Sequence, residues 1–362
     1  MPTEDGTTRS SDLEQGSDPS KTINERAFVE TTQWDEDDPA HPFKRSLAAR
    51  WLTVVIVSLC SLCVACTSSI YTTTYDQILD EFHCSQEVAT LGLSLFVFGM
   101  GFGPLILGPL SELYGRRIIF LSSFTFFLIW LIPCAVAKNI QTLLISRFFN
   151  GFAGSAFLSV AGGAVGDMFP RHQLAAPMMI YTASPFVGPE LGPLRWTFYT
   201  LLLWAATMLV SIYLFVPETH HPAILTQKAR EIRKETGNSW PLGPSENNNI
   251  PLSELLLRSI VRPIMLLTLE PMCLNLCVYS ALLLGILYLF FGAFQIVFES
   301  VYGFELWQRG LTFLGLLVGM VLAILSDPFW RRNYQRLEKD HQNPEASGFD
   351  PEWRLPPGTN FP

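Results

Sequence analysis

Long apolar runs separated by short polar segments make up most of the chain between residues 51 and 326. Six of these runs contain no Asp, Glu, Lys or Arg, and most reach the roughly 20 residues that a helix needs to cross the hydrocarbon core of a bilayer. Two further runs are each interrupted by one charged residue, Arg147 and Glu190. The pattern therefore predicts eight membrane-spanning helices, at about 51–75, 88–111, 118–137, 142–166, 176–194, 196–217, 271–298 and 310–326.

These runs are apolar on every side. A helix of a soluble all-α protein instead has one apolar stripe and one polar face. The composition agrees with a membrane protein, because 49% of the residues are hydrophobic and only 15% are charged, against about 25% in soluble domains. The sequence predicts an all-α integral membrane protein whose immediate partner is the lipid bilayer.

Polar segments divide these helices into groups. The N-terminal segment is acidic, with the run TTQWDEDDPAHP, and is expected to be disordered. In the central polar segment, ILTQKAREIRKE has helical spacing with a basic face, which predicts a linker helix along the membrane surface, although a calmodulin target would show the same pattern. The predicted organisation is a disordered acidic cytoplasmic tail at 1–46, a six-helix bundle at 47–217, a cytoplasmic linker with an amphipathic helix at 218–262, two helices of a second bundle at 263–326 and a polar C-terminal segment at 327–362.

Basic residues near the spans indicate the orientation, since Lys and Arg concentrate in cytoplasmic loops. With the N-terminus inside, sixteen Lys and Arg residues lie on the cytoplasmic side, and three (Lys138, Arg195 and Arg309) lie outside. We therefore predict a multi-pass protein with a cytoplasmic N-terminus.

The candidate chemistry does not indicate an enzyme. We find no paired-His motif, phosphate-binding loop or serine nucleophile elbow, and we expect no cofactor, no metal site and no nucleic-acid partner. The spacing of Cys60, Cys63 and Cys66 is superficially that of a cluster-binding run, but it lies within an uninterrupted apolar helix. Small packing residues are the better interpretation of these cysteines.

The turn GPLSELYGRR, at 108–117, joins the second and third predicted spans. A chain that leaves the membrane core and re-enters it exposes backbone groups that must be satisfied at the interface. The charges of this turn can satisfy them, and they can also cluster with the acid that ends the fourth span on the same side. We predict a salt bridge from that acid to one of the two arginines of the turn. The predicted cytoplasmic gating turn comprises Gly108, Glu112, Gly115, Arg116, Arg117 and Asp167.

Three motifs carry a resemblance to a known family. GPLSELYGRR resembles the signature loop between helices 2 and 3 of the major facilitator superfamily, with Glu112 where the family usually has Asp. RFFNGFAGS, at 147–155, resembles the helix 4 pattern of Arg followed four residues later by Gly. SPFVGPELGP, at 184–193, resembles the Gly-Pro motif of helix 5 in proton-driven drug antiporters.

The resemblance extends to the fungal-type twelve-helix drug:proton antiporters. RWTFYTLLLW, FVPETHHPAILTQKAREIRKETG and GILYLFFGAFQIVF are similar to their helix 6, central loop and helix 7. The resemblance implies a major facilitator fold, with a complete N-terminal six-helix bundle and the first two helices of the second. It also implies multidrug efflux of small organic substrates in exchange for protons, at the plasma membrane.

Two charged residues within spans are candidate transport residues. A charge inside the membrane costs several kcal/mol unless it is paired or faces a cavity, so Arg147 should line the interior of the bundle. The resemblance implies a role for Arg147 in proton coupling. Glu190 is either a titrating carboxylate or cation contact, or an acid at the external end of a short helix. The glycines and prolines around Glu190 permit close approach and bending, which predicts a helix 5 pivot at Gly188, Pro189, Gly192 and Pro193.

The sequence also departs from the family pattern. The chain passes directly from Leu194 to Arg195, where relatives have an external turn, and it ends where the family would enter helix 9. From the resemblance we expect a chain truncated after helix 8 that inserts into a membrane but does not transport by itself. The alternative function is therefore a non-transporting remnant, or a partner of a full-length transporter, with self-association possible.

Overall fold

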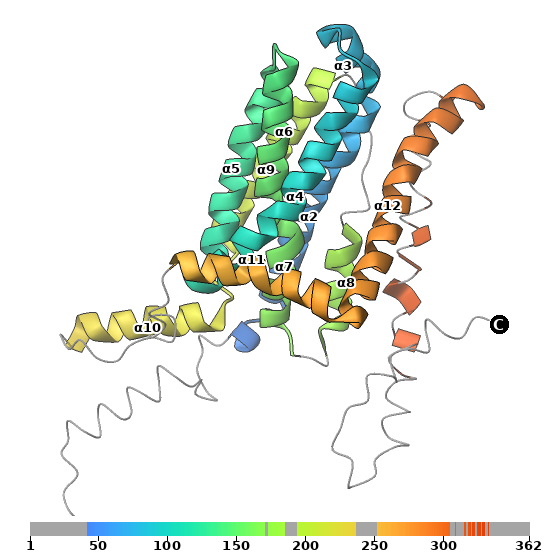
Figure 1. Cartoon of the computed structure of the whole chain (residues 1–362). Coiled ribbons are helices and arrows are strands. Elements are labelled where there is room, and N and C mark those ends of the chain that lie inside the picture. The colour runs from blue at the N-terminus through green and yellow to red at the C-terminus, as the bar shows by residue number, and fades with distance from the viewer. Residues whose placement is uncertain are drawn as a thin grey trace, which may run out of the picture.

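The described part of the computed structural model is an upright bundle of helices with two further helices at one end (Figure 1). The structure describes residues 42–170, 173–184, 194–236 and 252–304, and single residues between 308 and 332. Every regular element in these ranges is a helix. Residues 1–41 of the predicted acidic tail lie outside the described residues. Most of the eighth predicted span and most of the predicted C-terminal segment also lie outside them.

The apolar runs predicted from the sequence form the upright helices. Ser46 caps the first of them, because its Oγ accepts a hydrogen bond from the N–H of Ala49 at 3.3 Å. Six helical segments among the described residues are long and apolar enough to span a membrane. The upright helices are α2 (Leu47–Thr73), α4 (Gln86–Tyr114), α5 (Arg116–Val136), α6 (Ile140–Gly154), α7 (Ala156–Met168), α9 (Leu194–Phe215) and α12 (Pro271–Ser300).

The fourth predicted span consists of α6 and α7 in line. They are separated by Ser155, whose N–H still donates to the carbonyl of Gly151 at 3.1 Å, so the span continues from Ile140 to Met168. The fifth predicted span begins as α8 (Ala175–Ala183), and the rest of it, at 185–193, lies outside the described residues. At the opposite end of the bundle, α2 continues into a short amphipathic helix, α3 (Tyr75–Phe82).

Two further helices lie at the lower end of the bundle in Figure 1, where the first extends sideways from that end and the second runs across it. The first is α10 (His221–Thr236), the predicted linker helix. The second, α11 (Leu252–Leu269), was not predicted, and it crosses the predicted boundary at residue 262 between the linker and the second bundle. A three-residue helix, η1 (Pro42–Lys44), lies near the start of α10, where the rings of Phe43 and His221 are 5.6 Å apart.

The core of the bundle lies between α2, α5 and α7. Cys60, Cys63 and Cys66 are fully buried in α2 and act as packing residues, as predicted. The ring of Phe157 on α7 packs 5.0 Å from Phe120 and 4.9 Å from Phe124, both on α5. These contacts hold the short second half of the fourth span against its neighbours.

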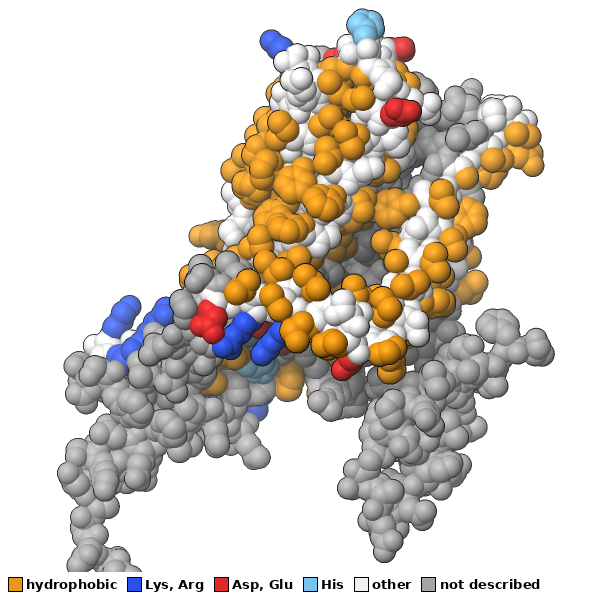
Figure 2. All heavy atoms as spheres, in the orientation of Figure 1, with side chains coloured by type: hydrophobic (Ala, Val, Ile, Leu, Met, Phe, Trp, Pro, Cys, Tyr) orange, Lys and Arg blue, Asp and Glu red, His pale blue; other side chains and the backbone are white. Residues whose placement is uncertain are grey.

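The outer surface of the upright helices is hydrophobic, and charged side chains gather at their two ends (Figure 2). Helix α12 stands beside the bundle and is exposed along its length. The hydroxyls of Ser68 on α2 and Tyr288 on α12 lie 3.4 Å apart and link α12 to the bundle. Together with the apolar spans, this surface identifies an integral multi-pass membrane protein.

Candidate functional site

Within the predicted gating turn, the junction between α4 and α5 is one residue long, because α4 ends at Tyr114 and α5 begins at Arg116. Gly115 lies between them with φ of +93°, a conformation that favours glycine. A Cβ at Gly115 would lie 2.5 Å from Oε2 of Glu218. The backbone angle therefore favours glycine at this position, and any side chain there would also displace the Glu218 carboxylate.

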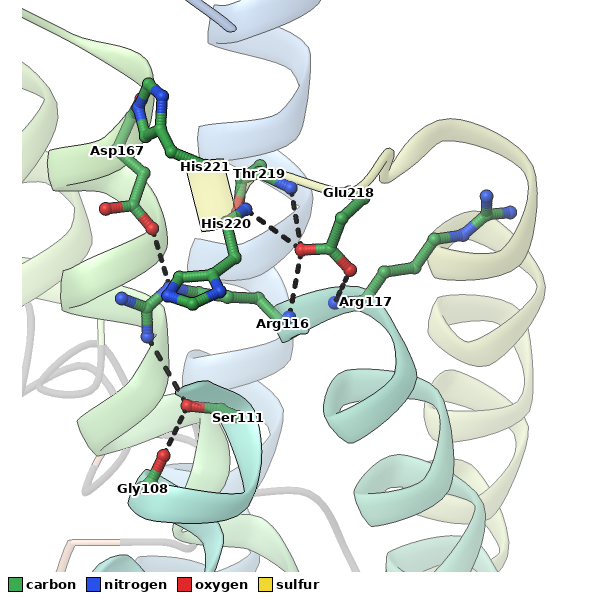
Figure 3. Close-up of polar contacts among 9 residues, drawn as sticks. All are labelled: Gly108, Ser111, Arg116, Arg117, Asp167, Glu218, Thr219, His220 and His221. Carbon is green, nitrogen blue, oxygen red and sulfur yellow. Dashed lines mark hydrogen bonds and ion pairs between the residues drawn. The ribbon is translucent and has the colours of Figure 1, made fainter. Parts of the chain in front are cut away.

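The carboxylate of Glu218, 102 residues after Arg116 in the chain, binds the start of α5 at this turn (Figure 3). It accepts hydrogen bonds from the N–H groups of Arg116 at 2.9 Å and Arg117 at 3.1 Å, the first two residues of α5. The same carboxylate accepts from the N–H groups of Thr219 and His220 in its own segment, at 3.0 and 2.9 Å. The first N–H groups of a helix have no partner within it and carry partial positive charge, so an anion there is stabilising.

The predicted salt bridge is present between Arg116 and Asp167. Nε of Arg116 lies 2.7 Å from Oδ2 of Asp167 at the end of α7, and the side chains are 13% and 22% exposed. The guanidinium lies flat against Gly163, where a Cβ would come within 2.7 Å of Nη2. Glycine on α7 thus makes room for the arginine of α5.

The other predicted members of the turn differ in their roles. Arg117 turns away from Asp167, and its Nη2 donates to the carbonyl of Tyr213 at the end of α9, at 3.0 Å. Glu112 is exposed on the last turn of α4 and forms no ion pair with the described residues, because that turn remains helical and directs the side chain outward. Gly108 has open space where a Cβ would stand. Glu218, which we did not predict, satisfies the backbone instead of Glu112.

Two histidines extend this cluster towards α10. One ring nitrogen of His221, Nε2, lies 3.1 Å from the carbonyl oxygen of Asp167. The carbonyl of His220 accepts from the N–H groups of Ala223 and Ile224 at 3.1 Å and so begins α10. The sequence signal that we missed is PETHH, an acid and two histidines directly after a span.

Replacing Asp167 by asparagine should lower the free energy of unfolding by about 2 kcal/mol, since it leaves the partly buried Arg116 guanidinium without its carboxylate. The matched control is Glu254→Gln on α11. That residue is 2.6 Å from Arg258, but both side chains are about half exposed, and the expected change is below about 0.5 kcal/mol. Thermal unfolding of the detergent-solubilised chain measures both. Equal losses in the two variants would contradict a structural role for the Arg116–Asp167 pair.

Arg147 forms a second candidate site inside the bundle. Its side chain is fully buried, as predicted for a residue that lines the interior. Its Nη1 donates to the carbonyl of Thr67 on α2 at 2.8 Å. The guanidinium carbon lies 3.9 Å from the ring centre of Tyr71, 5.3 Å from that of Phe96 and 5.6 Å from that of Phe198.

The partners of Arg147 are therefore aromatic faces and a carbonyl. Among the described residues no carboxylate forms an ion pair with it, and its Nε and Nη2 have no hydrogen-bond acceptor. Aromatic faces attract a cation through their negative quadrupole without neutralising it. Within the described part of the chain, the guanidinium is thus surrounded by aromatic rings and a carbonyl rather than by a counter-ion.

The remaining predicted site residues cannot be placed. Glu190 and the pivot residues Gly188, Pro189, Gly192 and Pro193 lie outside the described residues. Across the part of the chain that the structure describes, no group of three His, Cys, Asp or Glu side chains is positioned to hold a metal ion.

Comparisons with known proteins give the following similarities. The Major Facilitator Superfamily profile matches residues 57–337. "Efflux pump atB" of Aspergillus terreus is 48% identical over 335 residues, which cover 89% of this chain and 62% of that protein. "Probable drug/proton antiporter YHK8" of Saccharomyces cerevisiae is 40% identical over 315 residues, covering 84% of this chain and 61% of that protein.

The chain thus spans 62% and 61% of the length of these two relatives. Among solved structures, a D-xylose–proton symporter aligns with a TM-score of 0.47 and 15% identity, covering 77% of this chain and 69% of that one.

Proposed function

The chain belongs to the major facilitator superfamily, and from that premise we propose that it acts in the efflux of small organic molecules in exchange for protons. The observation that carries the proposal is Arg147, a fully buried guanidinium held by aromatic rings and a carbonyl. Among the described residues this buried charge has no carboxylate partner, and such a charge is expensive to maintain in a membrane protein, so we infer that it is retained for function. The names of the two relatives, an efflux pump and a drug/proton antiporter, support the same conclusion.

Arg147 acts on protons electrostatically. An arginine does not release its own proton in a protein, so its contribution is to change the proton affinity of a nearby titrating group. A positive charge in an apolar surrounding stabilises the ionised form of an acid that approaches it. Glu190 is the acid proposed for this role from the sequence, and the Gly-Pro pairs around it are the proposed pivot that moves it.

We propose that the gating turn closes the transport path at one end of the bundle, away from Arg147. Arg116–Asp167 and the Glu218 carboxylate join α4, α5, α7 and the segment after α9 at one end of the bundle. We propose that this end faces the cytoplasm, because the basic residues near the spans concentrate there. The plasma membrane is proposed from the resemblance to multidrug efflux proteins. Rearrangement of these polar contacts would accompany the change between inward-open and outward-open states.

An efflux assay tests the proposal. Two proteins are expressed in yeast cells of low intrinsic efflux: the chain itself, and a chimera of residues 1–304 followed by the remainder of the Aspergillus terreus pump. We expect one or both to lower the accumulation of cationic drugs or polyamines, and a protonophore to abolish the effect. If neither does so while the parent pump does and both proteins reach the membrane, the proposed function is wrong.

A further inference from the structure

The segment of residues 218–221 connects the linker helix α10 to the gating turn through the contacts of Glu218 and His221. Glu218 caps α5, and the buried Thr219 donates its N–H to the same carboxylate. His220 begins α10 with its carbonyl, and the ring of His221 contacts the carbonyl of Asp167. Any displacement of the start of α10 therefore pulls on the contacts that hold α5 and α7 together.

The imidazole of His220 lies in the middle of this cluster, beside the Arg116 side chain (Figure 3). Its Nδ1 is buried and has no hydrogen-bond partner among the described residues. The charged groups that act on it come from every side: Arg116 from α5, Asp167 from α7, Glu112 from α4 and Glu218 from its own segment. A titratable ring whose buried Nδ1 has no partner among the described residues thus lies beside the Arg116–Asp167 ion pair.

Burial of the ring lowers the pKa of His220 below its usual value near 6.5, and the positive charge of Arg116 lowers this pKa further. The carboxylates of Asp167, Glu218 and Glu112 oppose the shift without reversing it. The imidazole is therefore neutral at neutral pH in the closed cluster.

We propose that residues 218–221 form a proton-sensitive latch between the linker helix α10 and the gating turn, and that His220 is its titrating residue. A proton on His220 places a second cation beside Arg116, where it competes for Asp167. The ring then gains free energy by leaving the cluster for water. Because the segment is continuous with Glu218, this movement also withdraws the carboxylate that caps α5.

The direction of the pH dependence follows from linkage. The latched state binds fewer protons than a released state in which His220 has an ordinary pKa. Above about pH 6.5 both states are unprotonated at this residue and the latch is unaffected. As the pH falls below that value the released state gains a proton that the latched state does not, and release is favoured by up to about tenfold per pH unit.

The latch would let acidification of the compartment that faces α10 loosen the gating turn. That consequence rests on the proposed transport function, whereas the latch itself does not. The following experiment measures the contact alone, so its failure is distinguishable from failure of the transport assay.

Hydrogen–deuterium exchange of the full 362-residue chain in lipid nanodiscs tests the latch directly. The reporters are the amides of Arg116 and Arg117 at the start of α5, which donate to Glu218 across the contact. Their protection, corrected for intrinsic exchange, is compared at about pH 7.5 and about pH 5.5. We expect it to fall roughly tenfold at the lower pH, while amides in the middle of α5 stay protected.

Three variants make the result specific. His220→Gln should remove the fall, because glutamine does not titrate, and His220→Arg should give low protection at both pH values. His83→Asn should retain the fall, because it changes an exposed histidine at the opposite end of the bundle in a left-handed conformation that Asn tolerates.

Several outcomes would overturn the latch: an unchanged wild type, a full pH response in His220→Gln, or loss of the response in His83→Asn. If His220→Gln does not insert, His220→Arg decides the question. Normal protection at both pH values in that variant contradicts the proposal.

Discussion

Replacing Arg147 by methionine is expected to abolish proton-coupled efflux while changing the free energy of unfolding by no more than about 1 kcal/mol. Methionine has nearly the length of the arginine stem and packs against Tyr71, Phe96 and Phe198. It forfeits the hydrogen bond to Thr67 and the cation–π contacts, but it also removes the cost of a buried charge. The methionine variant should therefore lose efflux while keeping nearly all of its stability.

Two companion variants identify the cause. Arg147→Ala should lose function and also about 3 kcal/mol of stability, because it leaves a cavity among three rings. Arg147→Lys keeps the charge and should retain part of the flux. Each substitution is made in whichever protein is active in the yeast assay, the chain itself or the chimera. Thermal unfolding and drug efflux are then measured on the same preparations. Wild-type efflux by Arg147→Met would refute the role of the guanidinium.

Replacing Gly151 by alanine should destabilise the bundle by about 3 kcal/mol, and by valine should prevent its assembly. A Cβ at Gly151 on α6 would lie 2.0 Å from the carbonyl oxygen of Phe96 on α4. The contact is reciprocal, since a Cβ at Gly99 would lie 2.3 Å from the carbonyl oxygen of Phe148. Because both obstacles are backbone atoms, the two helices must separate, and helix association in membranes depends on such close packing.

Gly101→Ala on α4 is the matched control, because no atom lies within 4 Å of the Cβ position there. Its melting temperature should equal or exceed that of the wild type, since alanine favours the helix by about 1 kcal/mol over glycine. A similar loss in Gly151→Ala and Gly101→Ala would show that the close approach of α4 and α6 is not what holds the bundle together.

Much of this architecture could be predicted because membrane helices are encoded locally. Apolar runs of sufficient length gave α2, α4, α5 and α9 to within about four residues at each end. The spacing of the gating turn, together with its side of the membrane, was enough to pair Asp167 with an arginine. The interior position of Arg147 followed from the cost of exposing a charge to lipid.

What could not be predicted depends on tertiary neighbours. Helix α11 was missed because Arg258, Arg262 and Pro263 interrupt its apolar run, although a helix that lies across the end of a bundle tolerates them. Glu218 lies 102 residues from the amide of Arg116, and no local pattern indicates that separation. The aromatic neighbours of Arg147 come from α2, α4 and α9, so only the fold brings them together.

Simultaneous recording of drug and proton movement in proteoliposomes tests the central claim most directly. The form that is active in cells is reconstituted with a pH-sensitive dye inside the vesicles, and a cationic drug is added under an imposed pH gradient. The account predicts that drug and protons move in opposite directions, that collapse of the gradient stops drug accumulation, and that Arg147→Met abolishes both movements. Drug movement that continues unchanged after the gradient collapses, with no accompanying proton flux, would contradict it.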